Sequence, residues 1–156
     1  MDSGPIWKQA SVVEWCQVLL ASYRQWLGAD LIEPAGEPVS QSETLFHSPF
    51  VLVSHGIEDD PLLNYGNRLA LSLWELSWDE LTGTPARLTA EPVNRAEREG
   101  MLEQARANGH IKNYRGVRIS KSGRRFLIEH AVVWNVVDST GQRLGQAAIF
   151  SDWRFL

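Results

Sequence analysis

The sequence is short of the residues that build disulfides and metal sites. Cys16 is its only cysteine, which excludes an internal disulfide and a cysteine cluster for zinc. The histidines form no i,i+4 pair and none lies near Cys16, so we expect no metal site. They are His47, His55, His110 and His130.

Long apolar runs are also missing. No stretch approaches the roughly 20 apolar residues that cross a bilayer. The N-terminal residues lack the basic start and apolar run of a secretion signal. With so little cysteine, a reducing compartment is expected. We therefore predict a soluble, cytoplasmic protein that contacts no membrane.

Motifs of catalysis are sparse. The sequence has no Gly-x-Gly-x-x-Gly segment and no P-loop. Ser54 and His55, with Asp59 or Asp60 nearby, invite comparison with a catalytic triad. However, the Gly-x-Ser-x-Gly elbow is absent, and neighbours in a strand point to opposite faces. We predict that the protein is not an enzyme, and keep a small enzyme built on His55 or His130 as a third alternative.

Charge is unevenly distributed, although the net charge is only −4. Residues 1–91 hold 4 Lys/Arg and 13 Asp/Glu, whereas residues 92–156 hold 11 and 6. The stretch 112–125 contains six basic residues and no acid. It favours either solvated strand faces that pair with the acidic half or a nucleic-acid- or anion-binding surface. The second reading is our alternative function, and we expect no nucleic-acid binding.

An amphipathic helix is predicted over residues 11–27. Its apolar residues recur at spacings of three and four, which gives one apolar face. Ser11 and Glu14 match a capping box, and Gly28 is a stop signal. Residues 33–43 lose this periodicity and gain Pro, Gly and Ser, so we predict a connector.

Later segments predict a hairpin, helices and then a meander. Residues 50–53 and 62–65 read as two strands joined by a turn-rich segment. Three helical pieces follow: one capped by Asn67, a short one with a Ser77–Glu80 capping box, and one from Pro92 to Gly109. In the last, we place Val93, Ala96, Met101 and Ala105 inward, and Arg95, Arg98 and Glu99 outward. Strands are expected at 113–120, 124–137 and 142–153.

This order of elements resembles a PAS domain. Asn67 with its apolar helix is similar to the Asn-x-Ala segment of that fold, and residues 78–83 are similar to its short central helix. The resemblance implies an α+β fold. We therefore expect a five-stranded antiparallel sheet with helices on one face, preceded by the N-terminal amphipathic helix.

The chain resembles the MEKHLA family, a PAS-like group, more specifically. Several segments between residues 45 and 153 carry this resemblance. They are Phe50-Val-Leu-Val-Ser-His-Gly56, Asp60-Pro-Leu-Leu-Asn-Tyr-Gly-Asn-Arg68, Leu88-Thr-Ala-Glu91, Gly116-Val-Arg-Ile-Ser-Lys-Ser-Gly-Arg-Arg-Phe126, Val133-Trp-Asn135 and Gly145-Gln-Ala-Ala-Ile-Phe150. The hexapeptide that names the family is absent. We divide the chain into a helical extension with connector, 1–44, and a PAS-like MEKHLA domain, 45–156. The resemblance implies a sensing or interaction role.

The same resemblance suggests which cofactors to consider, because some PAS domains bind flavin or haem. Light-sensing flavin chemistry in such domains needs a cysteine at the start of the helix that follows the central ones, and Cys16 lies far outside that place. Haem sensors of this fold place a histidine on the long helix, and residues 93–108 contain none. We therefore predict neither flavin nor haem, while an unidentified small molecule is compatible with the fold.

A ligand pocket is predicted from strand alternation. In the strand 124–137, period two places His130 and Trp134 on one apolar face. Val117 and Ile119 would approach from the neighbouring strand, and Met101 from the long helix. Such a wall suits an apolar or aromatic ligand with one hydrogen-bonding group. The alternative is that His130 has a structural role and bonds a backbone carbonyl.

The apolar stripe of the N-terminal helix must cover the sheet or a second subunit, and we predict a homodimer through this helix.

Overall fold

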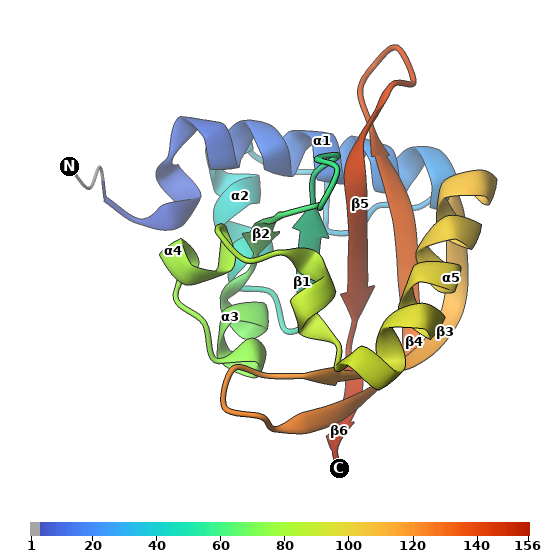
Figure 1. The fold of residues 1–156 in the computed structure, drawn as a ribbon. Helices are drawn as coiled ribbons and strands as arrows, with labels where there is room; N and C mark the ends of the chain where they lie inside the picture. The colour runs from blue at the N-terminus through green and yellow to red at the C-terminus, as the bar shows by residue number, and fades with distance from the viewer. Residues whose placement is uncertain (1–3) are drawn as a thin grey trace.

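The structure, a computed structural model that describes residues 4–156, has one antiparallel sheet between two layers of helices (Figure 1). Its strand order is β2-β1-β5-β4-β3, and β6 pairs with β4. The strands are β1 (Val51–His55), β2 (Leu63–Gly66), β3 (His110–Ile119), β4 (Arg125–Val137), β5 (Arg143–Phe150) and β6 (Asp152–Phe155). The predicted α+β fold is confirmed.

Most of the helices form where the sequence predicted them. They are η1 (Ile6–Lys8), α1 (Ala10–Leu27), α2 (Pro38–Phe46), α3 (Arg68–Trp74), α4 (Trp78–Leu81), η2 (Ala86–Thr89) and α5 (Pro92–Asn108). Asn67 caps α3 through its side chain, and Ser77 and Glu80 form the predicted capping box of α4. Among residues 4–156, no helix has the length and apolar character that crossing a membrane requires.

Helix α1 lies behind the sheet, and α3 and α5 lie in front of it (Figure 1). The predicted stripe of α1 packs against the sheet of its own chain, with Cys16 and Leu19 fully buried. Ser22 Oγ donates to Val137 O and accepts from Val137 N, both at 2.8 Å. Ser22 therefore supplies hydrogen-bond partners to the backbone of Val137, which lies past the last residue of β4 that pairs with β3.

Two N-terminal predictions are wrong. Helix α1 begins one residue earlier than expected, and its N-cap Gln9 makes no side-chain hydrogen bond, so the Ser11–Glu14 box does not form. Helix α2 occupies part of the predicted connector and crosses the predicted boundary at residues 44 and 45. Pro38 stands in its first turn, where a missing N–H costs nothing.

Strand β4 is interrupted by a bulge. Phe126 and Ile128 pack on the α3 side of the sheet, yet Ala131 also belongs to that cluster, which breaks period two. The pairing with β3 shifts between Gly116↔Ile128 and Tyr114↔Ala131. His130 at this shift has φ 57°, a left-handed conformation. Residues before and after His130 therefore alternate in opposite phase.

The C-terminal half of α5 is fastened to the sheet. Gln146 Nε2 donates to Leu102 O at 3.0 Å, and Asn135 Nδ2 donates to Arg106 O at 3.1 Å. Asn135 N donates to Gly109 O at 2.8 Å. The first turns of α5 differ from prediction, because Val93 is 83% exposed and Ala96 is also exposed.

Candidate cationic cavity

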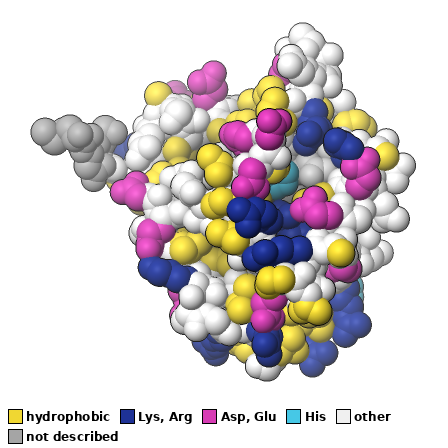
Figure 2. Space-filling view, in the orientation of Figure 1, with side chains coloured by type: hydrophobic (Ala, Val, Ile, Leu, Met, Phe, Trp, Pro, Cys, Tyr) yellow, Lys and Arg dark blue, Asp and Glu magenta, His cyan; other side chains and the backbone are white. Residues whose placement is uncertain are grey.

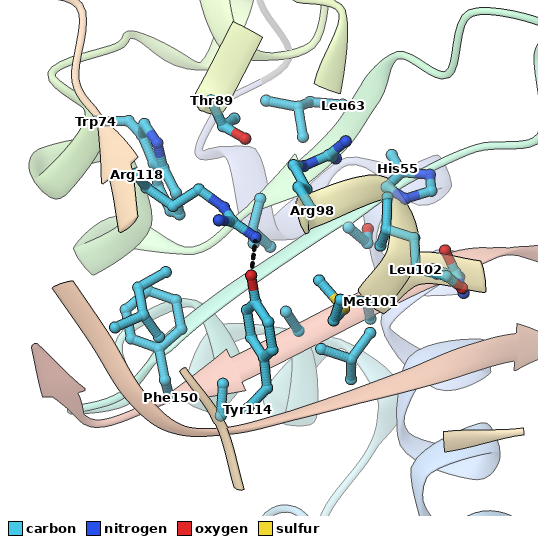
Figure 3. A pocket seen from close by; sticks show the side chains of 18 residues that line it. His55, Leu63, Trp74, Thr89, Arg98, Met101, Leu102, Tyr114, Arg118 and Phe150 are labelled. Carbon is cyan, nitrogen blue, oxygen red and sulfur yellow. Dashed lines mark hydrogen bonds between the residues drawn. The ribbon is translucent and has the colours of Figure 1, made fainter. Parts of the chain in front are cut away.

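A cavity of about 60 Å³ lies between α5 and the front face of the sheet. Most of its wall is apolar, with polar groups contributed by β1, β3, β5, η2 and α5 (Figure 3). The lining residues are Val53, Ser54, His55, Leu63, Trp74, Thr89, Arg98, Met101, Leu102, Tyr114, Arg118, Ile128, Ala131, Val133, Gln146, Ala147, Ala148 and Phe150. An apolar wall with a few converging polar groups is typical of a small-molecule site.

Two arginines are buried in this wall. Arg98 of α5 and Arg118 of β3 are only 6% and 5% exposed. In Figure 3, Arg118 extends toward the hydroxyl of Tyr114, to which it donates at 3.0 Å, and Arg98 lies between Arg118 and His55. Burial, and then the charge of Arg118, lower the pKa of Arg98 to about 10, so Arg98 is still protonated at neutral pH. The cavity is therefore cationic.

His55 closes the opposite end of the cavity. The residue is 8% exposed, and its Nδ1 lies 2.9 Å from Gly56 O. A carbonyl oxygen can only accept, so Nδ1 carries the proton and Nε2 of the neutral ring is an acceptor. Nε2 is buried and has no partner among residues 4–156. Burial lowers the pKa of His55, and the charges of Arg98 and Arg143 act in the same direction.

Of the five predicted site residues, the structure places only Met101 in the cavity wall. The prediction for His130 is wrong: its side chain is 69% exposed and Nδ1 lies 2.8 Å from Asp152 Oδ2. The bulge turns it outward, and it also sends Trp134 to the back face, against Tyr23 of α1.

Val117 and Ile119 are also misplaced by the prediction. Neither residue lines the cavity. They pair with Leu127 and Arg125 of β4, whereas Arg118 between them pairs with Phe126. Directly paired residues share a face of the sheet, so Arg118 stands with Phe126 on the cavity side and its two neighbours point away.

Most of the basic stretch 112–125 is engaged within the chain. Arg125 Nε lies 2.6 Å from Glu91 Oε1, Arg115 Nε lies 3.6 Å from Glu129 Oε2, and Lys121 pairs with Glu80. Arg124 stacks on the ring of Phe155, 3.4 Å from its centre. Pairing with acidic residues favours the solvated-face reading of this stretch. The absence of nucleic-acid binding stays a prediction.

The Ser54–His55 pair does not form a catalytic dyad. Ser54 Oγ accepts from Trp15 Nε1 of α1 at 2.9 Å and donates to Asn64 Oδ1 at 2.6 Å. The His55 ring turns to the other side of β1 and makes its one hydrogen bond, within residues 4–156, to Gly56 O. Ser54 and His55 therefore point to opposite faces of the strand, as strand geometry predicted. In the described part of the chain, no three His, Cys, Asp or Glu side chains are grouped to hold a metal ion.

The sheet order and the helices in front of the sheet define a PAS-like fold. A sequence model of the MEKHLA domain matches residues 13–155. The chain belongs to the MEKHLA domain family. No curated protein matches it.

Solved structures that resemble this chain are PAS and light-oxygen-voltage domains. The PAS domain of a protein from Colwellia psychrerythraea has a TM-score of 0.63 and 15% identity, and covers 75% of this chain and 94% of that one. An RNA-binding light-oxygen-voltage receptor has a TM-score of 0.64 and 17% identity, and the match covers 78% of this chain and 34% of that one. A light-oxygen-voltage domain studied with a flavin analogue has a TM-score of 0.59 and 14% identity, and the match covers 75% of this chain and 84% of that one. At these identities the likeness concerns the fold.

The cavity wall contains no cysteine for the photochemistry of light-sensing flavin domains. Cys16 is on α1, behind the sheet, where burial raises the pKa of its thiol, so no thiol faces the cavity. The cavity is also far smaller than the roughly 300–1,000 Å³ of common ligand sites. The cavity therefore suits a much smaller molecule than a flavin.

Sequence reasoning missed the cationic groups of the site. Arg98 precedes Met101 by three residues and Ala105 by seven, which places it on the inward stripe of α5. We assigned it outward because it is charged. The stripe itself was the signal that could have located it.

Proposed function

We propose that this chain is a PAS-like sensory module that binds a small molecule in the cavity beneath α5 and carries out no catalysis. The buried, unpartnered Nε2 of His55 is the observation that carries the proposal. Buried polar atoms in folded proteins nearly always have a partner, and His55 is one of the residues that line the cavity. A bound molecule would supply that partner.

Cavity filling tests the proposal. Ala131 lines the cavity and is 1% exposed, so Ala131→Leu fills part of the space. Ala107→Leu, on the exposed side of α5, is the matched control. Native mass spectrometry of freshly purified protein should show an additional small mass on the wild type and on A107L, and lose it on A131L.

The same variants give a second readout. A ligand that binds only the folded state raises its thermal stability. A small-molecule library should therefore contain compounds that raise the melting temperature of the wild type and A107L but not of A131L. If no mass is retained and every stabilising compound acts equally on A131L, the cavity is not a ligand site.

A further inference from the structure

The cavity holds more positive charge than its surroundings neutralise. Within residues 4–156, the Arg98 side chain makes one ion pair, from Nη1 to Glu99 Oε1 at 3.1 Å, and that carboxylate side chain is 65% exposed. Arg118 donates to Val117 O at 2.9 Å and to the Tyr114 hydroxyl, and makes no ion pair with a carboxylate of the described residues. A guanidinium has five donors, so most of those on the two residues remain available.

Such burial is costly without an anion. Removing a charge from water is unfavourable unless the charge is paired and hydrogen-bonded. The front surface around this site, shown in Figure 2, mixes basic and acidic side chains around a histidine. Arg98 pairs with the exposed Glu99, and Glu97 is linked to Arg118 through the Tyr114 hydroxyl. An anion inside the cavity would compensate both guanidinium groups at once.

We propose that Arg98 and Arg118 together bind the carboxylate of a short organic acid in this cavity. The inference rests on the proposed function and specifies its ligand. Guanidinium groups bind carboxylates through paired, charge-assisted hydrogen bonds, and the apolar wall formed by residues such as Met101 and Ile128 receives the hydrocarbon part. A hydroxyl on the acid can donate to His55 Nε2.

The size of the cavity limits the acid. A volume of about 60 Å³ is well below the roughly 300–1,000 Å³ of common ligand sites, so the cavity favours a short acid of few non-hydrogen atoms. Propionate and lactate are such acids, and benzoate is larger. The ligand is thus a short monocarboxylate rather than an aromatic acid.

Calorimetric titration of the full chain with sodium propionate and sodium lactate tests the assignment, with sodium chloride at equal concentration as the control. Propionamide has the shape of propionate without its charge. We expect both acids to bind, and propionamide and benzoate to bind at least tenfold more weakly. Equal affinity for propionate and propionamide, or binding of inorganic phosphate but of no carboxylate, would overturn the assignment.

Arginine variants connect the binding to this site. Arg98→Met should weaken propionate binding about 10- to 100-fold, the loss expected for charge-assisted hydrogen bonds. Arg106→Met, on the exposed side of the same helix, is the matched control and should bind like the wild type. If R98M does not fold, Arg98→Gln and Arg118→Gln take its place. Unchanged affinity in the folded variants rejects the proposal.

The two proposals fail differently. A neutral molecule retained by the wild type and lost on A131L would keep the cavity as a ligand site and reject the carboxylate. Binding of propionate that A131L and the arginine variants leave intact would place the acid elsewhere and reject the carboxylate assignment. The proposed function fails as well only if the wild type retains no mass that A131L loses and every stabilising compound acts equally on A131L.

Discussion

The buried ring of His55 affects folding through its charge. Burial lowers its pKa in the folded chain, so the folded state holds the proton less readily than the unfolded chain, in which the pKa is about 6.5. This contribution to stability is fully present above pH 6.5. It declines as the pH falls through 6.5 toward the lowered pKa of the folded state.

His55→Gln removes this titration and keeps a donor for Gly56 O. The free energy of unfolding in urea should fall between pH 7.5 and 5.5 more steeply for the wild type than for H55Q. Carboxylates with lowered pKa, such as Glu58 and Glu80, lose their contribution only near and below 4.5, outside this window. Equal slopes for the two proteins would contradict the assignment.

The exposed His130 is constrained by its backbone rather than by the cavity. A β-branched side chain at φ 57° is strained, so His130→Val should lower the unfolding free energy by about 1–2 kcal/mol. His130→Asn, which tolerates this conformation, is the control and should cost little. Denaturant midpoints measure both, and an H130V variant as stable as H130N would argue against the bulge.

At the scale of elements, two glycines of the α5 region should respond in opposite directions. Gly109 has φ 89°, and an added Cβ would lie 2.4 Å from a ring carbon of Trp26. Gly109→Ala should therefore destabilise by about 2–4 kcal/mol through strain and overpacking. Gly100→Ala, with nothing within 4 Å, should stabilise by about 0.5–1 kcal/mol. Thermal unfolding distinguishes the two.

Most elements could be predicted because local signals agreed with packing. The caps at Asn67 and Ser77 and the stop at Gly28 form as expected. Helix α2 was missed because a proline read as a break can equally begin a helix. The bulge at His130 has no local signal, since it is set by how β3 and β6 pair with β4.

The site was less predictable than the fold for the same reason. One extra residue in β4 reverses every later assignment of faces, which moved Trp134 from the cavity to the back of the sheet. Arg98 was assigned by its charge rather than by its position on the helix. A buried charge is an exception to composition rules, and such exceptions concentrate at binding sites.

For the whole molecule, α1 acts as the rear layer of the core. Leu19 is fully buried, so Leu19→Ala should cost about 2–5 kcal/mol, and Gln25→Ala on the exposed side should cost little. Deleting residues 1–32 would uncover Leu52, Tyr65 and Trp134, and should give an insoluble domain. A soluble, cooperatively folding 33–156 fragment would contradict this role.

The packing of α1 also changes the argument for a homodimer. The apolar stripe that suggested a second subunit is covered by the chain's own sheet. Dimer formation through the N-terminal helix therefore stays a prediction without that support. Sedimentation equilibrium over a range of concentrations tests it, and a monomer throughout would reject it.

The uneven fastening of α5 has a consequence for how molecules enter and leave. Its three hydrogen bonds to Asn135 and Gln146 lie at Leu102, Arg106 and Gly109, whereas its start, at Val93, stands in solvent. The first half of the helix is held to the sheet through Glu97, which accepts from the Tyr114 hydroxyl near the protein surface. An outward movement of this half would displace Arg98 before Ala105. Exchange of backbone amide hydrogens should accordingly be faster at residues 96–99 than at 105–108, and a tightly held occupant should slow the first group selectively.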